Sequence, residues 1–141
     1  MLRRSLAIAS IAVLFAGTAS AATVKFSAPL TAAAEVQHST STGSGTATVS
    51  LDTATHEITY DVTFSGFSSA VTAAAIHGPA EAGKNADVVV PLGDNPTSPI
   101  HGTFKLTPQQ EQQLTAGLYY VSVNTKNNPS GAVRGQLVEA K

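Results

Sequence analysis

The amino-acid sequence predicts an all-β protein: an antiparallel two-sheet sandwich of about seven or eight strands, with one short helix late in the chain. Two observations support this prediction. Apolar and polar residues alternate with a period of two in most segments, as they do in strands that bury one face. Short clusters of turn-forming residues separate these segments, and short connections favour antiparallel pairing. A closed barrel would show the same alternation, so it remains an alternative.

The first 21 residues have the features of a secretory signal peptide. Arg3 and Arg4 form a positive start, Leu6 to Phe15 form an apolar segment, and residues 19–21 supply the small side chains of a cleavage site. The apolar segment is shorter than the about 20 residues that a membrane-spanning helix needs. We therefore expect a secreted protein, periplasmic or extracellular, with no membrane span after cleavage and one domain at residues 22–141.

The composition of the expected mature chain excludes one class of partner. Without Arg3 and Arg4, six of the eight basic residues remain against nine acidic ones, a net charge of −3. A nucleic-acid-binding protein needs a basic face to neutralise phosphates, so nucleic acid is not an expected partner. The chain has no cysteine, so burial of apolar side chains rather than disulfides must hold the fold.

The alternation places the expected strands along the chain. They lie at residues 23–28, 46–51, 58–65, 71–77, 88–90, 100–106, 119–124 and 133–137. In the third strand we expect Ile58, Tyr60, Val62 and Phe64 to point inward and Thr59, Asp61 and Thr63 to point outward. The unbroken run at residues 88–90 predicts a strand buried on both faces. Residues 30–45 are small and polar, which indicates a loop.

The sequence from Thr107 to Gly117 predicts the one helix. Thr107 suits the N-cap, Pro108 suits the first helical position, and Gln110 completes a capping box. Leu114 offers an apolar anchor, and Gly117 is suited to end the helix. The strand, turn and strand that follow close the expected domain.

Three segments of the sequence lie in an order and spacing that resemble one family. They are residues 74–80 (AAIHGPA) followed by 88–92 (VVVPL), residues 117–125 (GLYYVSVNT) and residues 128–136 (NPSGAVRGQ). Together they resemble the CHRD domain, which occurs in chordin and as single secreted domains in bacteria. The resemblance covers essentially the whole mature chain, including Glu35 near its start.

The sequence departs from the usual CHRD pattern at three polar positions. Ala75 replaces the first histidine of His-Ile-His, Asn124 replaces the histidine of Asn-Val-His-Thr, and Ala132 replaces a glutamate. His77, Arg134 and Gln136 match the pattern. Two histidines two residues apart on a strand share a face, so the usual pattern is suited to a polar or metal site. This chain cannot assemble the same site.

Arg134 is the main candidate for a binding or structural role, together with Gln136, His77 and Asn124. It is the only arginine after residue 21, and its planar guanidinium has five donors in a fixed geometry. It either contacts a ligand or forms an internal clasp with an acid such as Asp61 or with loop carbonyls. We favour the clasp, because lysine would serve equally well at an exposed site.

The sequence contains no catalytic motif, and it predicts no cofactor. His77 and His101 are candidate metal ligands, but a metal site needs three or four ligands and the spacing supplies no others. A nucleophilic serine would need a Gly-x-Ser-x-Gly elbow, which the sequence lacks. We therefore expect a non-catalytic module of the cell envelope or exterior, with a structural role or a protein or glycan partner. The alternative is a metal-binding or metal-dependent envelope protein that uses His77 and His101.

The cleavage site yields a prediction about processing. The exported protein should begin at or near Ala22, because residues 19–21 end a suitable apolar segment. The intact mass of the exported species measures this directly. A mass that still includes residues 1–21 would indicate an anchored protein and contradict the expected localisation.

Overall fold

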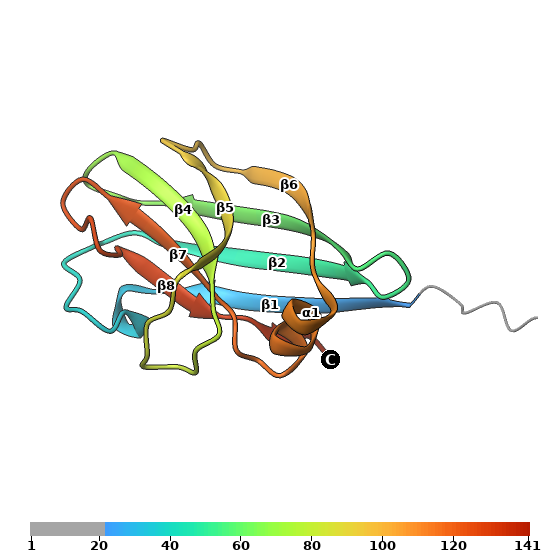
Figure 1. Ribbon diagram of the computed structural model, residues 1–141. Coiled ribbons are helices and arrows are strands. Elements are labelled where there is room, and N and C mark those ends of the chain that lie inside the picture. Colours follow the sequence, from blue (N-terminus) through green and yellow to red (C-terminus); the bar gives the residue numbers. More distant parts are fainter. Residues whose placement is uncertain (1–21) are drawn as a thin grey trace, which may run out of the picture.

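Two antiparallel sheets face each other in the computed structural model, which describes residues 22–141 (Figure 1). The predicted signal peptide lies outside the described residues. The strands are β1 (Thr23–Leu30), β2 (Ser44–Asp52), β3 (Glu57–Ser65), β4 (Val71–His77), β5 (Val88–Asp94), β6 (Ile100–Lys105), β7 (Tyr120–Thr125), β8 (Val133–Gln136) and β9 (Val138–Glu139). One sheet has the order β6-β3-β2-β1-β9 and the other β5-β4-β7-β8. The predicted two-sheet sandwich is confirmed.

The five-stranded sheet is built on a long, regular ladder. β1 pairs with β2 from Thr23↔Asp52 to Leu30↔Gly45, and β2 pairs with β3 over its full length. The turn between β2 and β3 is closed by Asp52, whose carboxylate accepts hydrogen bonds from the backbone of Ala54 at 2.9 Å and of Thr55 at 3.2 Å. Aspartate favours such turns because its short side chain reaches backbone donors two or three residues on.

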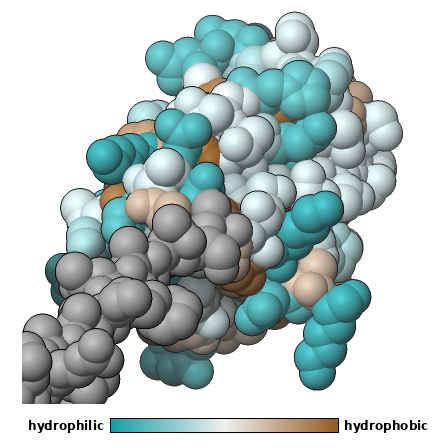
Figure 2. All heavy atoms as spheres, turned by 90° about the vertical axis from the view of Figure 1, so that its right-hand side faces the viewer, coloured by the Kyte–Doolittle hydropathy of each residue, from teal (hydrophilic) through white to brown (hydrophobic). Residues whose placement is uncertain are grey.

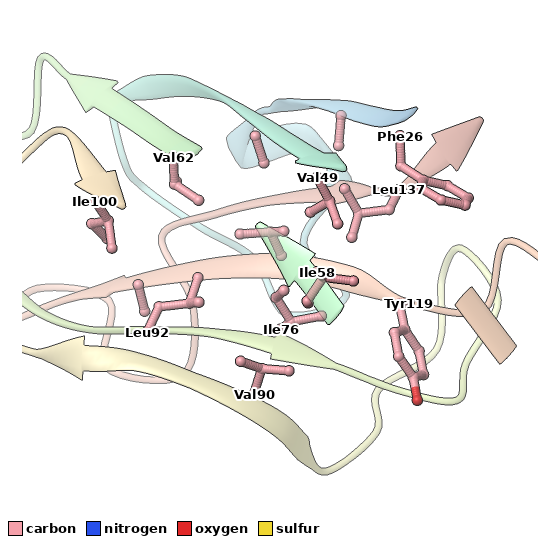
Figure 3. Packing of buried hydrophobic residues seen from close by; sticks show 14 of the residues in the cluster. Phe26, Val49, Ile58, Val62, Ile76, Val90, Leu92, Ile100, Tyr119 and Leu137 are labelled. Carbon is pink, nitrogen blue, oxygen red and sulfur yellow. The ribbon is translucent and has the colours of Figure 1, made fainter. Parts of the chain in front are cut away.

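The core lies between the sheets and follows the predicted alternation of β3. Ile58 and Val62 are buried, and Tyr60 and Phe64 are half-buried against the core. Thr59 and Thr63 are exposed on the outer face. The predicted inward and outward sets are therefore confirmed. Figure 3 shows Val49, Ile58 and Val62 opposite Ile76, Val90 and Leu92 of the other sheet.

The prediction that residues 88–90 form a strand buried on both faces is wrong. β5 is an edge strand, and its pairing with β4 contains two register shifts. Val90 and Leu92 reach the core, whereas the side chain of Val88 is 53% exposed. An edge strand has a neighbour on one side only, so a continuous apolar run there does not imply that both faces are covered.

Helix α1 (Pro108–Thr115) forms as its capping sequence predicts. The Thr107 hydroxyl accepts from the Gln110 backbone at 3.2 Å, and the Gln110 side chain accepts from the Thr107 backbone at 2.9 Å. Leu114 is buried, and Gly117 ends the helix with a φ of +79°. The expected loop at residues 30–45 also contains a short 3-10 turn, η1 (Ala32–Ala34).

The surface carries little clustered apolar area. Figure 2 shows the end of the molecule at the right of Figure 1, where hydrophilic and neutral residues cover most of the described surface in view. The exposed large apolar side chains of the described residues are Val36, Val88 and Val138, which lie on three separate segments. Within residues 22–141, no helix has the length and hydrophobicity to cross a membrane. Polar side chains are therefore the better candidates for a functional site.

The register of β3 can be tested with a matched pair of variants. Ile58→Ala should lower the free energy of unfolding by about 2–5 kcal/mol, because it leaves a cavity between the sheets. Thr59→Ala, next to it on the outer face, should change it by less than about 0.5 kcal/mol. Urea unfolding of both variants measures this difference. Equal losses would show that the strand does not bury the face described here.

Candidate functional site

The predicted site residues lie on the outer face of the four-stranded sheet, the face turned away from the core. Cross-strand pairing places His77 and Gln136 in one row with Tyr120 between them, and Arg134 in the next row with Ser122 and Ala75; Asn124 lies two residues beyond Ser122 on the same face of β7. Tyr120, Ser122 and Arg134 are nevertheless buried. Burial on an outer face means that other parts of the chain must cover it.

His77, Tyr120 and Arg134 form a stack across three strands. The rings of His77 and Tyr120 lie nearly parallel, with their centroids 4.9 Å apart and an interplanar angle of 3°. The guanidinium carbon of Arg134 lies 3.5 Å from the Tyr120 centroid. Because β7 lies between β4 and β8, the imidazole and the guanidinium contact opposite faces of the tyrosine ring. Such cation–π contacts gain strength when they are shielded from water.

The loop at residues 78–87 covers this stack and is held by four side chains. The Tyr120 hydroxyl accepts from the Ala86 backbone at 2.9 Å and lies 3.2 Å from the Ala86 carbonyl, which also contacts His77 Nδ1 at 3.0 Å. Gln136 donates to the carbonyls of Ala80 at 2.7 Å and Gly117 at 2.8 Å. We call these contacts, with those of Arg134 to the loop, the clasp.

Arg134 is buried, and its side chain makes three hydrogen bonds inside the protein. It donates to Asn85 Oδ1 at 3.2 Å and to the Glu81 carbonyl and Gln136 Oε1, both at 3.3 Å. The suggested pairing with Asp61 is wrong, because Asp61 lies on the other sheet, 3.2 Å from His101. Sequence patterning gave both residues to strands but did not show that they belong to different sheets.

The backbone of Arg134 also positions Glu35. Arg134 and Thr31 exchange two backbone hydrogen bonds of 3.0 Å, which join β8 to the end of β1. The turn η1 follows, and it brings Glu35 over β7, where its Oε1 lies 3.4 Å from the Ser122 hydroxyl. A Cβ at Gly131 would overlap with the Glu35 carboxylate, and the φ of Gly131 is +140°. Glycine at position 131 therefore makes room for this carboxylate.

A pocket of about 150 Å³ opens beside the clasp, and we call it the Glu35 pocket. It is lined by Glu35, His77, Asn85, Ala86, Tyr120, Ser122, Asn124 and Ser130. Within it the Ser122 hydroxyl lies between the Glu35 carboxylate and Asn124 Oδ1, at 3.4 Å and 3.3 Å. The pocket is therefore polar, and its wall contains a connected set of hydrogen-bonding groups.

The pKa values of Glu35 and His77, which line the pocket, are shifted from their ordinary values. Burial raises the pKa of the Glu35 carboxyl, which the hydrogen bond to Ser122 and the positive charge of Arg134 partly offset. Burial lowers the pKa of His77 below 6.5, and the positive charge of Arg134 also lowers it. The hydrogen bond to Ala86 and the negative charge of Asp87 raise this pKa and offset part of the shift. His77 is therefore neutral at pH 7. Because the Ala86 carbonyl only accepts, Nδ1 carries the proton and Nε2 keeps its lone pair.

The two histidines considered as metal ligands lie on opposite sides of the molecule. His77 is on the outer face of the four-stranded sheet, whereas His101 is on the outer face of the five-stranded sheet beside Asp61. They cannot bind one metal ion together, so the alternative that rests on this pair is wrong. Among residues 22–141, no three His, Cys, Asp or Glu side chains form a group that could hold a metal.

Of the four predicted site residues, His77 and Asn124 line the Glu35 pocket, while Arg134 and Gln136 lie beneath the loop. Glu35 and Ser122 were not among the site residues predicted from the sequence. Glu35 is the only Asp, Glu, Lys or Arg between Lys25 and Asp52, a signal that could have marked it. Nothing in the local pattern of Ser122 indicates that its hydroxyl meets a residue 87 positions away.

The fold and pocket define a two-sheet β-sandwich with a polar site on the outer face of one sheet. A comparison with models of protein families matches residues 26–137 to the CHRD domain. The match spans most of the chain, and the chain belongs to the CHRD domain family, as the three sequence segments suggested. A comparison with curated proteins found no match, and a comparison with solved structures found none either.

The three departures from the usual family pattern all occur on the outer face of the four-stranded sheet. Ala75 pairs with Ser122, and Asn124 lines the Glu35 pocket. The backbone N–H of Ala132 donates to the Val123 carbonyl. The Ser39 hydroxyl donates to the Ala132 carbonyl at 2.6 Å and covers this residue. The substitutions therefore change the chemistry of the same surface that carries the pocket.

The clasp predicts that Arg134 cannot be replaced by lysine. Arg134→Lys keeps the charge but loses the planar group that stacks on Tyr120 and donates in three directions. Each hydrogen bond of a charged group makes a net contribution of about 1.5–3 kcal/mol to stability. The free energy of unfolding of the variant, measured with urea, should therefore fall by at least about 2 kcal/mol. Lys105→Arg, at an exposed position of β6, should lose less than about 0.5 kcal/mol. Unchanged stability of Arg134→Lys would disprove the clasp and make Arg134 a candidate for ligand contact.

Proposed function

We propose that the chain is a secreted, non-catalytic binding module that holds part of its partner in the Glu35 pocket. One observation carries this proposal. Three polar atoms of residues that line the pocket have no hydrogen-bonding partner among the described residues, namely Glu35 Oε2, His77 Nε2 and the amide nitrogen of Asn124. No buried side-chain nitrogen or oxygen of the described residues lacks a partner, so these three atoms reach solvent and can exchange water for the groups of a partner molecule.

The geometry around Ser122 supports binding rather than nucleophilic catalysis. A catalytic serine needs a base, most often histidine, within hydrogen-bond reach of its hydroxyl. The Ser122 hydroxyl contacts Glu35 and Asn124 and forms no hydrogen bond with either nitrogen of His77, whose Nδ1 is bonded to Ala86. The serine therefore has no histidine base in this arrangement.

The proposed location is the bacterial cell envelope or its exterior. It rests on the predicted signal peptide and on membership of the CHRD domain family. The absence of cysteine is compatible with an oxidising compartment, because the fold is held by its buried core. A protein or a glycan of that compartment is the partner that we propose.

The Asn124→Ala variant tests the pocket. The labelled exported protein is titrated onto intact cells of its own species and onto the polysaccharide and protein fractions of their envelopes. Loss of the Asn124 amide should weaken binding about tenfold, the equivalent of one good hydrogen bond. Thr63→Ala, on the outer face of the other sheet, serves as the control and should bind like the parent.

Two outcomes would contradict the proposal. If Asn124→Ala binds as tightly as the parent, the partner does not use the Glu35 pocket. If the parent binds neither the cells nor either fraction, the chain is not a binding module for the envelope, and a structural role becomes the better explanation.

A further inference from the structure

The charges at the Glu35 pocket disfavour a charged ligand. The positive charge of Arg134 offsets part of the negative charge of Glu35, and Asp87 adds a second negative charge near His77, so the pocket is surrounded by charges of both signs. His77 adds no charge near neutral pH. An ionic ligand of either sign would therefore give up its hydration beside a group of like charge, which is unfavourable in a half-buried site.

Arg134 is also unable to receive an anion directly. Its guanidinium donates to Asn85, the Glu81 carbonyl and Gln136, and one face of it lies against Tyr120. A bidentate contact with a carboxylate or phosphate would require breaking the clasp. The buried arginine thus sets the potential of the pocket without serving as its anion receptor.

The unpaired groups of the pocket include both acceptors and donors. Glu35 Oε2 and His77 Nε2 accept, while the Asn124 amide nitrogen and the Ser130 hydroxyl can donate. A purely apolar ligand would leave these groups desolvated and unpaired. A hydroxyl group donates and accepts at once, so adjacent hydroxyls on one ring can satisfy the carboxylate and the amide together.

The size of the pocket limits what enters it. Its volume is about 150 Å³, and a cavity of about that size accommodates a single six-membered ring. The planar faces of Tyr120 are both occupied, so a ligand ring meets only the edge of the tyrosine. Recognition then depends on hydrogen bonds rather than on stacking.

From the charges of both signs, the mixed donors and acceptors and the volume, we infer that the Glu35 pocket binds one uncharged sugar residue of a glycan through adjacent hydroxyl groups. This inference rests on the proposed binding function and names its ligand class.

Nitrogen-15 NMR titration of the exported protein tests the ligand class with free sugars. The neutral probes are glucose, galactose, mannose and N-acetylglucosamine; the charged ones are glucuronate, galacturonate, glucosamine and galactosamine, at pH 6.5. At least one neutral sugar should shift the amide signals of Ala86, Ser122 and Asn124, with a dissociation constant on the order of millimolar. Each of the four charged sugars should bind at least tenfold more weakly than that neutral sugar.

The Glu35→Gln variant tests the charge argument separately. Removing the carboxylate charge leaves that of Arg134 opposed only by the more distant Asp87 among the groups near the pocket, so the preference for a uronate over the amino sugar with the same ring should rise at least tenfold. Glu57→Gln, at an exposed position of the five-stranded sheet, is the matched control and should show no such change. A circular-dichroism melt like that of the parent verifies that each variant is folded.

The outcomes separate the ligand class from the function. If a charged sugar binds more tightly than every neutral one, or if Glu35→Gln leaves the charge preference unchanged, the inference about an uncharged sugar is wrong. If no sugar shifts the pocket amides while Asn124→Ala still weakens envelope binding, the function stands and the partner is not a glycan. If no sugar shifts the pocket amides and Asn124→Ala binds the envelope as tightly as the parent, both proposals fail.

Discussion

The structure of the candidate site depends on a buried guanidinium that is satisfied by stacking and hydrogen bonds rather than by an acid. Arg134 is 1% exposed, and it is the one charged residue among the buried polar side chains of the described chain. A buried charge without compensation would cost several kcal/mol. Here the Tyr120 ring, two groups of the loop at residues 78–87 and Gln136 supply that compensation. The buried charge of Arg134 is therefore stabilised by the Tyr120 ring and the loop at residues 78–87, and Arg134 in turn holds that loop over the ring.

The same interactions create the Glu35 pocket. The loop that is held over the stack provides the Asn85 and Ala86 side of the pocket, and the stacked His77 and Tyr120 provide its floor. The opposite side comes from Glu35, which the backbone bridge between Thr31 and Arg134 brings within reach. Arg134 thus positions one wall through its side chain and the other through its backbone. In this view the residue has a structural role and sets the electrostatic potential for a ligand that it does not touch.

Local patterning predicted the parts of the fold that local chemistry determines. The alternation of β3 identified its buried face, and the capping sequence at Thr107 identified the start of α1, because both depend on neighbours within a few residues. The burial of residues 88–90 was predicted incorrectly, because it depends on which strand lies at the edge of a sheet. The partner of Asp61 and the separation of His77 from His101 depend on the assignment of strands to sheets in the same way.

The site was predictable only in part for a related reason. Period-two alternation marks the residues that point away from the core, including Tyr120, Ser122 and Asn124, but an outer face is normally exposed. What buries this face is a loop of the chain and the turn that carries Glu35, and such coverage between distant segments leaves no periodic signal. The family pattern directed attention to His77 and Arg134, whereas the carboxylate opposite them became apparent only in three dimensions.

Amide hydrogen exchange in a Tyr120→Phe variant tests most directly whether the stacked side chains hold the loop. The substitution keeps the ring between His77 and Arg134 and removes the hydroxyl that accepts from the Ala86 amide. Protection of the Ala86 amide should fall at least about tenfold, while core amides such as that of Val49 should retain theirs apart from any global loss of stability. If protection of Ala86 is unchanged, the loop is held by its own backbone, and the central role of the clasp is contradicted.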